Sequence, residues 1–251
     1  MLKKPVALQT FTVRDDLAKD YKGTIEQIAK IGYKGIEIGG DLGGMTPAEM
    51  RKFIDGLGLK AISYHCTYDQ LTDNTQSAID FAKEFDMKFV VCPVASAETA
   101  DGWRSLGQSL EKAGAKLHEA GIRLCYHNHA HELKEYDGVR AIDILLGSTS
   151  DKLLFWQLDT FWVKTVGVDP TEYIRNYAGR IPLIHLKDMT AGDNPTFAEV
   201  GAGILDWKEI FSAADEAVVE WYVVEQDSCQ RPPLESIRIS LDNLKKIGVA
   251  E

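Results

Sequence analysis

The sequence predicts a (β/α)₈ TIM barrel that spans residues 1–251 as a single domain. The chain has 251 residues, of which 45% are hydrophobic, and this length is typical of one barrel with a large core. Eight short apolar runs alternate with longer helical patterns, as in a repeated strand–helix unit. The first run leads into QTFTVRDD, without the GxGxxG or Walker turn that is typical of an open doubly wound sheet.

The eight predicted strands are mostly continuous apolar runs. This pattern is typical of parallel strands that are covered on both faces. The predicted strands are PVALQ (5–9), GIEI (35–38), KAISYH (60–65), KFVVCP (88–93), IRLCYH (122–127), LLFWQLD (153–159), IPLIHL (181–186) and WYVVE (221–225).

Helix signals separate these strands. The clearest is TPAE at 46–49, which has a threonine cap, proline at the first helical position and glutamate three residues after the cap. Gly58 ends that pattern. A similar capping pattern at 24–27 predicts a helix that begins there and ends at Gly32. Two further helices, each ending at a glycine, are predicted over 105–121 and 236–248.

Composition limits the partners and the compartment. The formal net charge of -10 disfavours nucleic acid and anionic membranes, because both bind positive surfaces. No apolar run approaches the roughly 20 residues of a membrane-spanning helix, and MLKKPVALQTF lacks the apolar core of a signal peptide. The four cysteines include no CxxC pair, which indicates reduced thiols. We therefore expect a cytoplasmic protein.

Ionisable residues gather at the ends of the predicted strands, where a TIM barrel carries its chemistry. His127, Asp159, His185 and Glu225 lie at the ends of four consecutive strands and are expected to converge above the barrel mouth. Two imidazoles and two carboxylates suit a divalent transition metal better than Ca²⁺, which prefers oxygen ligands. Mn²⁺ is the expected metal, and Zn²⁺, Co²⁺ or Fe²⁺ would also suit this donor set.

Side-chain alternation distinguishes the three histidines of YHNHAH. Cys125, His127 and His129 share one face of the strand, because successive side chains point to opposite faces. His127 is therefore predicted to bind the metal, and His129 to lie one step higher, beside the substrate. His131 is expected in the following loop with a solvated role.

Other residues near the strand ends are candidates for contacting a substrate. Lys187 shares the face of His185 and would stand near the substrate, where a neighbouring divalent cation would depress its pKa. Glu199 is expected to order the loop that contains EVGAGILDW, and contact with the substrate is the alternative. The candidates for substrate binding are His65, Trp162, Glu37 and Arg231.

Seven segments carry a resemblance to a known family: LQTFTVRDDL, GYKGIEI, YHNHAHEL, QLDTFWV, HLKDM, EVGAGILDW and VVEQD. Together they resemble the xylose isomerase-like TIM barrels, the group of sugar phosphate isomerases and epimerases, over essentially the whole chain. In the ketose 3-epimerases of this family, Glu, Asp, His and Glu on strands 5 to 8 hold the metal. Asp159, His185 and Glu225 match the last three positions, whereas His127 stands at the position of the first glutamate and Trp162 at that of a histidine.

The resemblance implies a divalent-metal-dependent sugar isomerase or epimerase, which removes a proton next to a metal-polarised carbonyl. Glu225 would then act as the base, and His129 and Lys187 would contact or protonate substrate oxygens. The YHNH form also resembles a subgroup proposed to act on 3-keto-sugars and C-glycosides. A lyase or hydratase that acts on such a sugar or on a cyclitol is therefore the alternative. A non-catalytic, metal-containing sugar-binding protein is a second alternative, and homodimers are common among similar proteins.

Overall fold

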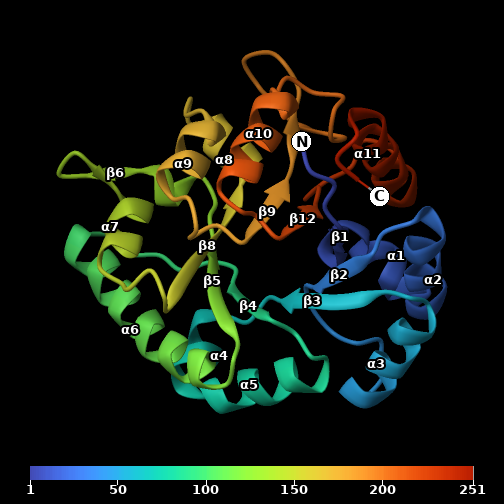
Figure 1. Ribbon diagram of the computed structural model, residues 1–251, viewed down its shortest axis with the longest axis horizontal. Coiled ribbons are helices and arrows are strands. Elements are labelled where there is room, and N and C mark those ends of the chain that lie inside the picture. The colour runs from blue at the N-terminus through green and yellow to red at the C-terminus, as the bar shows by residue number, and fades with distance from the viewer. Residues whose placement is uncertain (251) are drawn as a thin grey trace.

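The computed structural model describes residues 1–250, in which eight parallel strands form one sheet at the centre of the molecule (Figure 1). Each strand lies inside one of the eight predicted apolar runs, so the predicted strands are confirmed. They are β1 (Val6–Gln9), β2 (Gly35–Ile38), β3 (Lys60–Tyr64), β4 (Phe89–Cys92), β5 (Arg123–His127), β8 (Leu154–Asp159), β9 (Leu183–Leu186) and β12 (Trp221–Val224).

Closure of the sheet into a barrel depends on its two edge strands, β3 and β4. The strand order is β3-β2-β1-β12-β9-β8-β5-β4, and all neighbours are parallel. His65, which follows β3, forms a parallel bridge with Val91 of β4, and the Cys66 amide donates to the Val91 carbonyl oxygen at 2.8 Å. The interior side chains of all eight strands therefore face one shared space, which confirms the TIM-barrel prediction.

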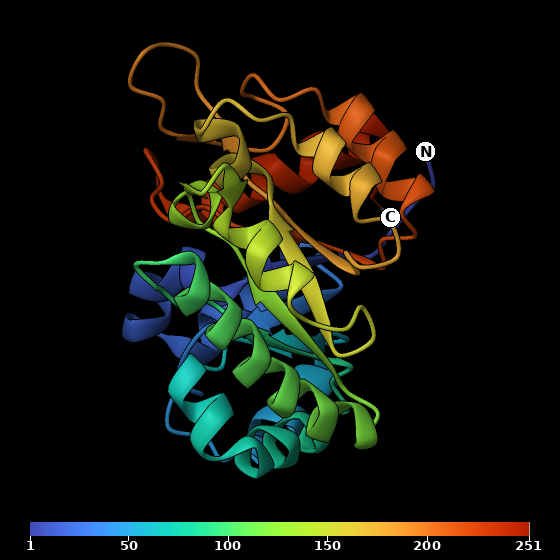
Figure 2. The same ribbon diagram turned by 90° about the vertical axis from the view of Figure 1, so that its left-hand side faces the viewer.

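Helices surround the strands on the outside of the barrel (Figures 1 and 2). Within residues 1–250, none of them is both long and apolar enough to cross a membrane. The helices are α1 (Arg14–Lys19), α2 (Tyr21–Ile31), α3 (Pro47–Gly56), α4 (Tyr68–Asp73), α5 (Thr75–Glu84), α6 (Ala100–Glu119), α7 (Ala141–Gly147), α8 (Thr160–Thr165), α9 (Pro170–Asn176), α10 (Trp207–Glu216) and α11 (Pro233–Ile247). The short elements are η1 (Thr10–Val13), η2 (His131–Leu133), β6 (Glu135–Tyr136), β7 (Val139–Arg140), β10 (Asp188–Met189) and β11 (Phe197–Ala198).

Several predicted helix ends are correct because local capping residues set them. Thr46 caps α3 by accepting from the Glu49 amide, while the Glu49 carboxylate accepts from the Thr46 amide. α2 and α11 end at Gly32 and Gly248, and both glycines have the left-handed conformation that a side chain disfavours.

Three predicted helix starts are wrong. α11 begins at Pro233, before the predicted residue 236. α2 begins at Tyr21, because the Asp20 side chain caps it, and Thr24 is a buried residue within the helix. α6 begins at Ala100, before the predicted residue 105, because Thr99 provides its cap. In α2 and α6 the capping residue lies upstream of the pattern that was taken as the start of the helix.

The inside of the barrel consists of an apolar layer followed by a polar one. The apolar layer comprises Ala7, Ile62, Phe89, Val91, Cys125, Leu183 and Val223. Four of these strands carry a buried polar residue two positions further on, and these residues form the polar layer: Gln9, His127, His185 and Glu225. Because side chains alternate along a strand, these polar groups point to the same interior at its carboxyl end. Cys125 and His127 thus share the inner face, as predicted.

α6 passes so close to the chain before β8 that one of its glycines has no room for a side chain. A Cβ atom on Gly114 would collide with the carbonyl oxygen of Leu153, a backbone atom. We predict that Gly114→Ala lowers the free energy of unfolding by about 1–3 kcal/mol through overpacking. Urea denaturation measures this change.

Gly56 at the end of α3 provides the control, because the space around its Cβ position is open. Gly56→Ala is expected to raise the free energy of unfolding by about 0.5–1 kcal/mol, since alanine restricts the unfolded chain more. A Gly114→Ala variant as stable as Gly56→Ala would contradict the close approach of α6.

Candidate metal and substrate site

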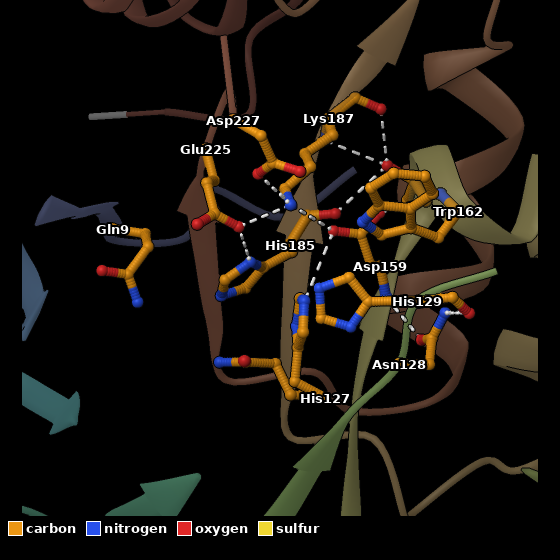
Figure 3. Close-up of polar contacts among 12 residues, drawn as sticks. Gln9, His127, Asn128, His129, Asp159, Trp162, His185, Lys187, Glu225 and Asp227 are labelled. Carbon is orange, nitrogen blue, oxygen red and sulfur yellow. Dashed lines mark hydrogen bonds and ion pairs between the residues drawn. The ribbon is translucent and has the colours of Figure 1, made fainter. Parts of the chain in front are cut away.

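Four side chains that were predicted to bind metal converge at the carboxyl end of the barrel (Figure 3). His127 ends β5, Asp159 ends β8, His185 lies within β9 and Glu225 follows β12. All four are buried, and one nitrogen or oxygen atom of each lies within 4.8 Å of the others. We call these four residues the ligand cluster.

The donor atoms of the ligand cluster suit a divalent cation. The atoms that meet in the cluster are nitrogen and carboxylate oxygen, the ligand atoms that divalent transition metals take from proteins. His127 Nε2 and Asp159 Oδ2 lie 3.9 Å apart. Burial, together with the charges of His185 and Lys187, lowers the pKa of His127 well below its usual value. The ring is therefore neutral, which is the form that binds a metal.

Asp159 is held in place by the chain around it. Its amide donates to Asn128 Oδ1 at 3.0 Å, and the same oxygen accepts from Trp156 Nε1 at 2.8 Å. Asp159 Oδ1 accepts from the Trp162 amide at 3.0 Å and caps α8, while Oδ2 lies on the side of His127 and Lys187. Burial raises the pKa of Asp159 to about 6, and the charge of Lys187 limits the increase.

A buried lysine balances the carboxylates of the site. Lys187 Nζ lies 2.7 Å from Glu225 Oε2, 2.8 Å from Asp227 Oδ1 and 3.1 Å from Asp159 Oδ2 (Figure 3). Burial lowers the pKa of Lys187, but the three carboxylates outweigh burial and raise the pKa above its usual value. In this arrangement the three carboxylates hold the ammonium group in its charged form, and the depressed pKa expected beside a bound divalent cation stays a prediction.

His185 lies between two carboxylates. Its Nδ1 is 2.8 Å from Glu225 Oε2, and its Nε2 is 2.6 Å from Glu37 Oε1. Burial lowers the pKa of His185, but Glu37 and Glu225 outweigh it and raise the pKa to about 10. Burial also opposes ionisation of Glu225, yet the charges of Lys187 and His185 lower the pKa of Glu225 below its usual value. Glu225 is therefore an ionised acceptor.

A cavity of about 460 Å³ opens above the ligand cluster at the barrel mouth. Three residues predicted to contact substrate, His65, His129 and Lys187, face this cavity. Burial and the charge of Lys187 lower the pKa of His129 to about 4, so its ring is neutral and can accept a proton. The rest of the wall consists of Phe11, Gly39, Pro93, Val94, His127, Glu225 and Asp227.

Three other residues predicted to bind substrate are not among those that line this cavity. Glu37 is fully buried inside the barrel and bonded to His185. The Trp162 ring packs beside His129, with ring centroids 5.6 Å apart. Arg231 Nε lies 2.9 Å from Glu199 Oε1. This ion pair supports the structural role expected of Glu199. Arg231 takes part in the same contact and therefore helps to fix the loop that contains Glu199.

His131 lies outside the ligand cluster, as expected. It begins η2, and its Nε2 lies 2.9 Å from the Ala95 carbonyl oxygen, so it anchors the turn and is less free in solvent than expected. The neighbouring Glu132 is buried and accepts from the His129 amide and from the Tyr126 hydroxyl, each at 2.7 Å. These bonds fix the turn after β5 and hold His129 at the cavity.

Two residues of the site were missed by sequence reasoning. Asp227 contacts Lys187 and faces the cavity. It follows Glu225 by two positions, so the alternation rule that was applied to His127 and His129 could have identified it. Asn128 supports Asp159 from the neighbouring strand, and such a contact between strands gives no signal in a single sequence.

Asp188 fixes the loop that follows β9. Its carboxylate accepts from the amides of Gly201, Gly203 and Leu205 at 2.9, 3.0 and 3.2 Å, and from Trp207 Nε1 at 2.7 Å. A Cβ atom on Gly203 would collide with this carboxylate, so the close approach requires glycine. One buried side chain thus holds the EVGAGILDW segment against the barrel.

A closed parallel barrel with histidine and carboxylate side chains gathered at its carboxyl end is the architecture of a TIM-barrel enzyme. The chain belongs to the xylose isomerase-like TIM barrel family, whose sequence profile matches residues 25–247. The family resemblance inferred from the sequence motifs is therefore confirmed.

Curated relatives of the chain are named inosose dehydratases. The chain is 26% identical over 206 residues to the inosose dehydratase of Clostridium perfringens, and the match covers 74% of this chain and 65% of that protein. It is 26% identical over 260 residues to the inosose dehydratase of Lacticaseibacillus casei, where the match covers 86% of this chain and 85% of the relative. The named relatives are thus enzymes that act on sugar-like molecules.

Solved structures share the fold. A sugar phosphate isomerase/epimerase from Parabacteroides distasonis superposes with a TM-score of 0.87 at 24% identity, covering 100% of this chain and 96% of that one. The IolI protein, solved with a binding zinc atom, superposes with a TM-score of 0.79 at 15% identity, covering 97% of each chain.

Lys187 is predicted to be essential to the stability of the metal-free site. Lys187→Met would leave three neighbouring carboxylates without their cation, and we expect the free energy of unfolding to fall by about 3–5 kcal/mol in buffer with a chelator. Mn²⁺ should restore more stability to this variant than to the wild type, because the cation replaces the missing charge. Chemical denaturation with and without Mn²⁺ measures both effects.

Lys112→Met is the matched control, because Lys112 lies on the exposed face of α6. Its stability is expected to equal that of the wild type under both conditions. If Lys187→Met were also as stable as the wild type in chelator, Lys187 would not balance the carboxylates.

Proposed function

We propose that the protein is a divalent-metal-dependent lyase that removes water from a keto-cyclitol, a polyhydroxylated ring in which one hydroxyl has been oxidised to a ketone. The names of the curated relatives support this elimination over the isomerase or epimerase reaction that the sequence analysis placed first. The observation that carries the proposal is the convergence of the ligand cluster beneath a cavity that also exposes His129 and Lys187.

The ligand cluster has the donor chemistry of a divalent transition-metal site. Two imidazoles and two carboxylates suit both Zn²⁺ and Mn²⁺. The zinc atom of the IolI protein supports a divalent metal in a protein of this fold. When bound, such a cation would polarise the ketone of the substrate and make the adjacent C–H bond more acidic.

The proposed reaction is a β-elimination. A base removes the proton from the carbon next to the ketone, and the electrons of that C–H bond form a carbon–carbon double bond. The hydroxyl on the following carbon takes up a proton and leaves as water. The resulting enol rearranges to a diketone, so the product differs from the substrate by one water and no oxidant is required.

His129 and Lys187 are placed for the two proton transfers. His129 is neutral and faces the cavity, and we assign it the removal of the C–H proton. The Lys187 ammonium faces the same cavity and would donate to the leaving hydroxyl. Glu225, the base expected from the sequence, already contacts both His185 and Lys187 and is the weaker candidate. His65 would bind a substrate hydroxyl.

We predict that the Mn²⁺- or Zn²⁺-loaded protein converts a keto-cyclitol to a product lighter by one water. A panel of keto-cyclitols and 3-keto-sugars in D₂O, followed by mass spectrometry, tests this prediction. Deuterium at the carbon next to the ketone without a loss of water would indicate epimerisation instead. Bound metal with neither exchange nor water loss would indicate a sugar-binding protein.

His127→Ala is predicted to remove the bound metal, because the substitution takes one of two imidazoles from the ligand cluster. Elemental analysis after metal loading and desalting measures the metal content. His131→Ala is the control and is expected to keep the wild-type metal content, since its ring contacts the Ala95 carbonyl instead. Full metal content in His127→Ala would exclude β5 from the site.

A further inference from the structure

Glu37 is a charged residue buried inside the barrel beside the ligand cluster. Its side chain is fully buried, and side-chain donors from five other residues surround its two oxygens. Oε1 accepts from Gln9 Nε2 at 2.8 Å and His185 Nε2 at 2.6 Å and lies 3.1 Å from His65 Nε2, while Oε2 accepts from Ser63 Oγ at 2.6 Å and Gln157 Nε2 at 2.7 Å. Protein groups thus occupy both oxygens, which leaves Glu37 unsuited to the substrate contact expected from the sequence.

The strands around Glu37 are arranged to hold its carboxylate. The register between β2 and β3 shifts at this point, so Ile36 pairs with Ala61 but Glu37 pairs with Ser63. This bulge brings the Ser63 hydroxyl to the carboxylate. Burying a carboxylate costs free energy unless it is paired and hydrogen-bonded, so this complete set of donors stabilises the ionised form.

The contact with His185 links Glu37 to the ligand cluster. An ionised carboxylate only accepts hydrogen bonds, so His185 Nε2, at 2.6 Å, must carry a proton and donate it to Glu37. The other ring nitrogen, Nδ1, lies on the side of Glu225 Oε2, at 2.8 Å. A histidine held by a carboxylate through one nitrogen offers the other nitrogen to a metal.

We propose that Glu37 is a positioning residue that fixes the ring of His185, so that Nδ1 is the atom His185 contributes to a metal in the ligand cluster. The inference rests on the metal binding of the proposed function and is independent of the reaction. Without the Glu37 carboxylate the ring can turn, and either nitrogen can then face the cluster. Metal binding becomes weaker because part of its free energy is needed to order the ring.

Glu37→Gln tests this proposal through metal affinity, measured as Zn²⁺ competition with a chromophoric chelator. We expect the affinity of Glu37→Gln to be about 10–100-fold weaker than that of the wild type. Ser63→Ala removes a donor to the same carboxylate without touching His185, and it is expected to keep the wild-type affinity. Wild-type affinity in Glu37→Gln, or an equal loss in both variants, would overturn the proposal.

A crystal structure of the wild-type protein loaded with Zn²⁺ gives a second test that does not depend on the folding of a variant. We expect coordination through His185 Nδ1, with Nε2 still bonded to Glu37. Coordination through Nε2, or by Glu37 itself, would refute the positioning role. Neither test uses a substrate, so a metal-loaded protein that leaves keto-cyclitols unchanged would refute the lyase reaction and leave the role of Glu37 intact.

Discussion

The need to balance charge inside the carboxyl end of the barrel determines how the site is built. Burying carboxylates in this interior costs free energy unless cations or hydrogen-bond donors contact them. Lys187 forms ion pairs with three carboxylates that come from two different strand ends. Glu37 accepts hydrogen bonds from His185 and from neutral donors. These contacts hold the side chains together, so one nitrogen or oxygen atom of each of His127, Asp159, His185 and Glu225 lies within reach of a single cation.

Single-strand patterns were enough to predict the ligand cluster, but not the residues that support it. Asp159, His185 and Glu225 were found because they stand at the carboxyl ends of predicted strands, where a TIM barrel carries its chemistry. The position of Glu37 depends on a register shift between two strands, and Arg231 pairs with an acidic residue from a distant loop. Contacts of this kind form between elements that are distant in the sequence, and the pattern of residues along a single strand does not predict them.

The imidazole of His127 changes the charge of the ligand cluster relative to the ketose 3-epimerases that the sequence resembles. A glutamate at this position gives three carboxylates, whereas two carboxylates and two neutral imidazoles match the charge of a divalent cation. A cation with fewer anionic ligands polarises a ketone more strongly. In those epimerases two glutamates act on opposite faces of one sugar carbon, and His127 stands in place of one of them. Elimination instead needs one base and one acid, and His129 and Lys187 both face the cavity.

Asp188 makes the rim of the barrel asymmetric. On the side of β9, its bonds to Gly201, Gly203 and Leu205 tie the following loop to the strand end. On the opposite side, the rim of the cavity carries the exposed side chains of Phe11 and Val94. The cavity wall is thus exposed beside the ends of β1 and β4, whereas hydrogen bonds to one buried carboxylate fix the loop beside β9.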